Sequence, residues 1–86
     1  MNSMLKLKER TNESVIYFYS ADSTLWKNNE PICDGEICYN FQTDEVEILK
    51  YSTDDSEGKR AKWVIGFLGR IIFKENCPQD RFIAVG

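Results

Sequence analysis

The sequence predicts an α+β domain in which antiparallel hairpins come first and one long helix and a final strand follow. Two observations predict this class. The first two-thirds of the chain contain short β-branched and aromatic segments separated by turn-forming residues. The last third contains apolar residues spaced three and four apart, followed by one more short apolar segment. Because a chain of 86 residues builds one hydrophobic core, we expect a single domain, 1–86.

The N-terminal strands are predicted from alternation and composition. Leu5 and Leu7 alternate with lysines, which is the pattern of a half-buried strand, and we expect this strand at an edge of the sheet. The β-branched and aromatic run 15–20 predicts a central strand that is buried on both faces. Residues 21–31 are expected to form a polar loop that carries Trp26.

Turn-forming residues organise the middle of the chain. Asp34 and Gly35 suit a tight type I′ hairpin turn after a short strand that ends at Cys33. Alternatively, Gly35 simply begins the next strand. A second hairpin is predicted from the segments 36–41 and 45–51, which have alternating apolar faces and form the best-supported strand pair.

A single helix is expected after the second hairpin. Because N-cap residues and early carboxylates favour a helix start, it should begin between Asp54 and Gly58, and it should end near Asn76. Its buried stripe is predicted to comprise Ala61, Val64, Ile65, Leu68, Ile71 and Ile72. The last strand, 81–86, would follow through a right-handed β-α-β crossover and run parallel to the strand 45–51.

The composition limits the classes of partner. A net charge of −3 argues against binding to a nucleic-acid backbone, which favours a basic surface. The N-terminus lacks the apolar stretch of a secretory signal, and no segment has the length of a membrane span. We therefore expect a soluble cytoplasmic protein whose partner is neither a membrane nor a nucleic acid.

Three cysteines, at Cys33, Cys38 and Cys77, are predicted to be buried and reduced. An odd number without a CxxC pair suits a reducing compartment better than a disulfide framework. Since the chain has no histidine, a metal site would need three thiolates and a carboxylate such as Asp34, in a spacing that matches no common zinc pattern. No metal site is therefore predicted.

Catalysis has few candidate residues. The lack of histidine and of phosphate-binding glycine motifs argues against classical nucleophilic hydrolysis, and no catalytic residue is assigned. The acidic clusters 44–47 and 54–57 can supply acid and base pairs if burial separates their pKa values. Alternatively, they are simply a turn and a helix cap.

The hairpin strands 35–41 and 44–51, followed by Glu57-Gly58-Lys59-Arg60-Ala61 at the expected helix start, resemble the central part of the Gcn5-related N-acetyltransferases. In that family a strand hairpin leads into a loop whose backbone amides, at the start of a helix, bind the pyrophosphate of coenzyme A. The resemblance implies a truncated topology of this type over 35–86. It also implies an acetyl-CoA site at Gly58, Lys59, Arg60 and Ala61.

The helix also carries aromatic residues beside its core stripe. Trp63 and Phe67 lie one turn apart and extend the apolar arc beyond what one sheet face requires. They form, with Trp26, a predicted partner-binding set, because tryptophan and its aromatic neighbours dominate interface energetics. Alternatively, the loop that carries Trp26 folds over Trp63 and Phe67 inside the monomer.

Two functions from different classes follow from these observations. The first is an accessory protein that needs no cofactor and binds another protein or a second copy of itself, as an inhibitor or modulator of the kind carried by phages and mobile elements. The alternative is an acetyl-CoA-dependent acyltransferase, or an inactive relic of one.

Overall fold

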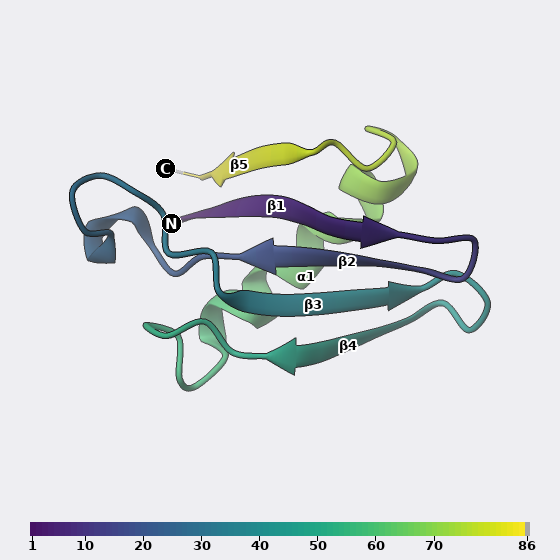
Figure 1. Cartoon of the computed structure of the whole chain (residues 1–86), viewed down its shortest axis with the longest axis horizontal. Coiled ribbons are helices and arrows are strands. Elements are labelled where there is room, and N and C mark those ends of the chain that lie inside the picture. Colours follow the sequence, from purple (N-terminus) through teal and green to yellow (C-terminus); the bar gives the residue numbers. More distant parts are fainter. Residues whose placement is uncertain (86) are drawn as a thin grey trace.

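The computed structural model describes residues 1–85 and consists of one five-stranded antiparallel sheet with a helix across one face (Figure 1). The strands are β1 (Asn2–Arg10), β2 (Ser14–Tyr19), β3 (Gly35–Asn40), β4 (Glu45–Lys50) and β5 (Asp80–Ala84). The helix α1 spans Lys59–Phe73, and a short 3-10 helix, η1, spans Ser23–Leu25. Strand-rich hairpins thus precede one long helix and a final strand, as predicted for an α+β domain.

The strand order in the sheet is β4-β3-β2-β1-β5. The first four strands form a meander, and β5 returns to pair with β1. The prediction that Leu5 and Leu7 lie in an edge strand is therefore wrong, because β1 has neighbours on both sides. Alternation of apolar and polar residues indicates that one face of a strand is buried. It does not indicate whether a later strand pairs with the free edge of that strand.

Burial alternates along every inner strand, so the sheet has one covered face and one uncovered face. Val15, Tyr17 and Tyr19 point toward α1 and are buried, whereas Ile16 and Phe18 point to the other side and are half-buried. The expectation that 15–20 is buried on both faces is therefore wrong. Only one layer packs on this sheet within the described residues, so an uninterrupted apolar run here does not indicate double burial.

Gly35 is the first residue of β3, and the predicted Asp34-Gly35 hairpin does not form. Gly35 pairs with Tyr19 and its backbone lies against the Tyr19 ring, so that a Cβ at this position would lie 2.1 Å from Tyr19 Cε1. The glycine is thus required for close approach rather than for a turn. Asp34 instead accepts hydrogen bonds from Ser52 Oγ at 2.7 Å and from the backbone N–H of Thr53 at 3.0 Å.

The helix begins at Lys59, slightly later than predicted, because the acidic segment before it forms a cap rather than a first turn. It ends at Phe73, short of the predicted Asn76. Asn76 and Cys77 adopt positive φ angles of 58° and 53°, which are incompatible with a continuing right-handed helix. The predicted core stripe is largely confirmed, with only Ile65 half-buried and the following residues buried: Ala61, Val64, Leu68, Ile71 and Ile72.

The connection from β4 through α1 to β5 spans the whole sheet. β5 runs parallel to β4, as expected, but three strands lie between them. In Figure 1 both strands run to the left, α1 lies behind the sheet, and the chain passes from the lower edge to the upper edge, which makes a left-handed path. The predicted right-handed crossover is therefore not formed. The hand is fixed by the apolar face, since α1 must cover the side from which Leu5 and Ile37 point.

Candidate functional site

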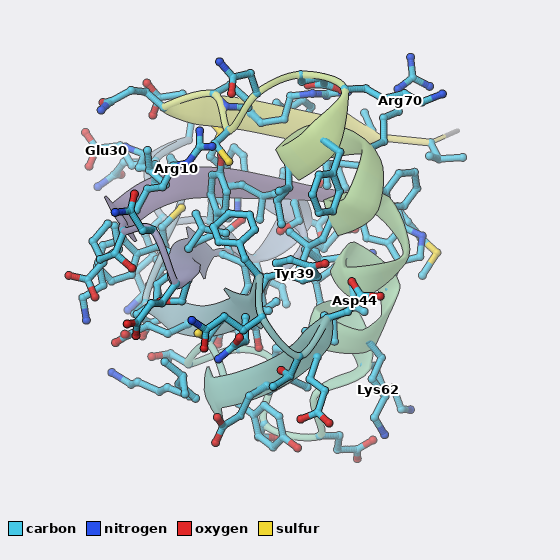
Figure 2. All side chains as sticks on the ribbon, turned by 90° about the vertical axis from the view of Figure 1, so that its right-hand side faces the viewer. Arg10, Glu30, Tyr39, Asp44, Lys62 and Arg70 are labelled. Atoms are coloured by element: carbon cyan, nitrogen blue, oxygen red, sulfur yellow. The ribbon has the colours of Figure 1, made fainter. Side chains whose placement is uncertain are left out.

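One face of the sheet carries no helix in the part of the chain that the structure describes. Figure 2 looks along the strands and shows α1 on one side of the sheet, with side chains alone projecting from the opposite side. The apolar residues on the uncovered side come from four strands, and we call them the open face: Met4, Ile16, Phe18, Cys38 and Phe82. Phe82 is 43% exposed and the other four are half-buried.

Trp26 closes one end of the open face. Its ring packs edge-to-face against Phe82, with 6.0 Å between the ring centroids. The indole Nε1 donates a hydrogen bond to the carbonyl of Ala21 at 3.1 Å, which fixes the side chain. Trp26 thus extends the apolar surface by one anchored aromatic ring.

A charged pair spans the centre of the open face. Lys8 Nζ lies 2.7 Å from Glu36 Oε1 and 5.5 Å from the centre of the Phe18 ring. Both charged side chains remain in contact with solvent, so the pair contributes little to stability. The pair therefore passes over the Phe18 ring and places charged groups among the apolar side chains of the open face.

Trp63 and Phe67 lie on the opposite side of the molecule, on a flank of α1. Their ring centroids are 5.0 Å apart, and both side chains are half-buried and pack against the core. The Arg60 guanidinium lies 5.0 Å from the Trp63 ring and forms an ion pair with Asp22 at 3.2 Å. Trp26 packs against Phe82, whereas Trp63 packs against Phe67. The loop that carries Trp26 reaches the helix flank through Asp22, whose partner Arg60 lies over the Trp63 ring.

At the helix start 58–61, a carboxylate of the same chain occupies the place where a bound anion would lie. The Asp55 carboxylate accepts hydrogen bonds from the backbone N–H of Arg60 at 2.9 Å and of Ala61 at 3.0 Å. Asp55 also accepts a hydrogen bond from the Tyr19 hydroxyl at 2.8 Å. Burial raises the pKa of Tyr19 above its ordinary value, and the neighbouring carboxylate raises it further, so this hydroxyl remains a donor.

The remaining members of the predicted acetyl-CoA site, Gly58 and Lys59, do not reproduce a phosphate loop. Gly58 adopts a φ of 71° and packs against the ring of Tyr51, where a Cβ would lie 2.7 Å from a ring carbon. Lys59 is exposed and pairs with Glu57 at 3.1 Å. A phosphate would have to displace Asp55 to reach the amides of this helix start.

The three cysteines are free, but only Cys77 is buried. Cys33 and Cys38 are half-buried, which corrects the expectation of three buried thiols; both lie where no helix covers the sheet. Burial raises the pKa of the Cys33 thiol. A hollow of about 360 Å³ beside Cys38 is lined by Cys38, Asn40, Thr43, Glu45, Val46 and Glu47. Glu45 and Glu47 are exposed there, which suits surface charges rather than an acid and base pair.

An aromatic cluster at the end of α1 was not predicted from the sequence. Tyr39, Phe41 and Phe73 pack edge-to-face, with ring centroids 5.5–6.3 Å apart, although Phe73 is 63% exposed. Figure 2 shows Tyr39 between the sheet and the helix, where its hydroxyl donates a hydrogen bond to Asp44. This bond raises the pKa of Tyr39. The acidic residue Asp44 thus belongs to a turn. Tyr39 and Phe41 lie on the alternating apolar face of the predicted strand 36–41, but no sequence pattern indicated that Phe73 packs beside them.

Comparisons with protein-family models, with curated proteins and with solved structures found no match for this chain. Among the described residues, no helix is long and apolar enough to cross a membrane.

Proposed function

We propose that this domain acts by binding another protein through the open face, as an inhibitor or modulator rather than as an enzyme. The observation that supports the proposal is the uncovered sheet side, on which apolar residues from four strands lie together. Antiparallel sheets commonly leave one face to solvent, but that face is then polar. On this face aromatic and aliphatic side chains lie among charged ones, and aromatic side chains on such a surface are typical anchors for a partner protein.

The open face supports this function better than the aromatic flank of α1. Trp63 and Phe67 pack against each other and against the core, so part of their apolar area is already buried within the monomer. Phe82, by contrast, is 43% exposed, and Phe18 lies on the side of the sheet that no helix covers. A partner gains more from burying side chains that are still in contact with water.

The proposal is tested by comparing the proteins that wild-type and variant baits retain from the native host. Phe18→Lys replaces an aromatic ring of the open face by a charge, so it should abolish retention of the partner. The domain should stay folded, because Phe18 lies outside the buried core. Lys62→Glu, on the exposed side of α1, is the control and should retain the partner. If Trp63→Ala abolished retention while Phe18→Lys did not, the helix flank would be the binding surface.

The acyltransferase alternative makes a separate prediction. A protein that binds acetyl-CoA at Gly58, Lys59, Arg60 and Ala61 should be stabilised by about 2.7 kcal/mol at a coenzyme concentration one hundred times its dissociation constant. The internal cap by Asp55 opposes this outcome, since the carboxylate holds two of the amides that the pyrophosphate would need. An unchanged melting temperature at millimolar acetyl-CoA would exclude the alternative.

A further inference from the structure

One row of side chains crosses the uncovered side of the sheet from edge to edge. The strand pairings set its members opposite one another, one from each strand. In the order of the sheet, from β4 to β5, the row is Lys50, Glu36, Phe18, Lys6 and Asp80. Glu36, Phe18, Lys6 and Asp80 point to the same side, because directly paired residues share a face. The register shift between Ile37 and Glu36 in the pairing with β4 brings Lys50 to that side as well.

The charges along this row are complementary to the same row turned around. From the β4 edge toward Phe18 the row is positive at Lys50 and then negative at Glu36. From the β5 edge it is negative at Asp80 and then positive at Lys6. A half-turn about Phe18 therefore places Lys6 over Glu36, and Lys50 over Asp80. Within this row each positive side chain meets a negative one, and no like charges meet.

We propose that the open face binds a second copy of this chain. The two copies are related by a two-fold axis that lies between their sheets, parallel to β2 and above its outward-pointing side chains. The inference rests on the proposed function, since it names the protein that covers the open face. A two-fold interface must be complementary to itself, because each surface patch meets an identical patch. The row through Phe18 meets that condition.

The residues on the proposed axis meet the condition as well. A side chain on a two-fold axis faces its own copy, so a charged residue there would face a like charge. The outward-pointing residues of β2 are Ser14, Ile16 and Phe18, none of which is charged. Lys8, from β1, lies 5.5 Å from the centre of the Phe18 ring, so its side chain has to turn away from the axis when the second copy binds. Phe18 would pack on Phe18 of the second copy, and Ile16 on Ile16, which gives the interface an apolar centre.

The distances allow the inner charged pairs to form. Sheets pack face to face about 10 Å apart, and Lys6 and Glu36 lie one strand, or about 5 Å, to either side of the axis. A crossing angle of about 30° between packed sheets displaces them by only about 2–3 Å, which a lysine side chain spans. Lys8 occupies Glu36 Oε1, which leaves the other carboxylate oxygen for Lys6 of the second copy.

Charge reversal tests the inference in solution. Wild-type protein should show a concentration-dependent dimer in sedimentation equilibrium. Lys6→Glu alone or Glu36→Lys alone creates two like-charge contacts in each dimer, so each should raise the dissociation constant at least about tenfold. An equimolar mixture of the two variants should form a heterodimer, because both contacts then become opposite in sign again. The double variant should dimerise by itself for the same reason.

Two control variants accompany the charge reversals. Lys62→Glu and Glu57→Lys make the same charge changes at exposed positions away from the open face, and both should dimerise as the wild type does. A wild type that stays monomeric at millimolar concentration would overturn the inference. So would a dimer that the single variants do not weaken, or variants that fail to recover on mixing. If the wild type is monomeric but still loses a host protein on Phe18→Lys, the proposed function stands and only the second copy is wrong.

Discussion

Close contacts of a few side chains fix the centre of the sheet. The Tyr19 ring lies against the Gly35 backbone, and its hydroxyl accepts a hydrogen bond from the backbone N–H of Ser52 at 3.0 Å while donating to Asp55. The Tyr17 hydroxyl donates to the carbonyl of Pro78 at 2.6 Å, and burial raises the pKa of Tyr17 to about 12. The hydroxyl groups of these two tyrosines therefore hydrogen-bond β2 to the segment before α1 and to the segment after it.

Gly35→Ala should destabilise the protein by about 1–3 kcal/mol, because the added methyl group overlaps the ring of Tyr19, which is fully buried. The free energy of unfolding in urea measures the effect. Gly66→Ala is the matched control: its Cβ would meet nothing within 4 Å, and alanine favours the helix by about 0.5–1 kcal/mol, so this variant should be more stable than the wild type. Equal effects of the two substitutions would show that the contact with Tyr19 is not tight.

At the scale of single elements, the cap of α1 matters most. Asp55 is 7% exposed and accepts two backbone N–H groups of the first helical turn, whereas Asp54 is exposed. The sequence predicted a cap within this acidic segment, but four candidates of similar type stand side by side there. Only the packing of Tyr19 against Asp55 selects among them, and that contact joins residues 36 positions apart.

Asp55→Ala should destabilise the protein by about 1–3 kcal/mol, since it removes the cap and leaves the buried Tyr19 hydroxyl without its acceptor. Asp54→Ala should change the free energy of unfolding by no more than about 0.5 kcal/mol, because that side chain is exposed. Chemical denaturation followed by circular dichroism at helical wavelengths compares the two variants. A larger loss of stability from Asp54→Ala would show that Asp54, and not Asp55, caps the helix.

The strands show what alternation predicts and what it leaves undetermined. Leu5 and Leu7 identified β1 correctly as a half-buried strand, and the segments 36–41 and 45–51 identified the β3 and β4 hairpin. The prediction of a hairpin turn at Asp34 and Gly35 was wrong, because the same dipeptide also suits the start of a strand. Local sequence does not reveal that Gly35 lies opposite Tyr19, since this contact depends on a pairing across a long loop.

At the scale of the whole molecule, the class was predictable and the binding surface was not. The helix stripe and the strand patterns were sufficient for an α+β domain with the final strand after the helix. The position of β5 beside β1 and the hand of its crossover depend on which face of the meander is apolar, which the pattern of single strands does not reveal. The open face is assembled from Met4, Ile16, Phe18, Cys38 and Phe82, which belong to different strands, so it appears only after the strand order is known. Helical spacing, in contrast, directed attention to Trp63 and Phe67 because both lie in one element.

The central claim, that the uncovered side of the sheet is the binding surface, is tested most directly by methyl NMR spectra recorded over a range of protein concentrations. Met4 and Ile16 report on the open face, and Ile65, on α1, reports on the helix side. We expect the signals of Met4 and Ile16 to shift as the concentration rises, because a second copy covers them, while the signal of Ile65 stays unchanged. Shifts confined to Ile65, or no concentration dependence at any of the three positions together with unchanged spectra on addition of a host partner, would contradict the account.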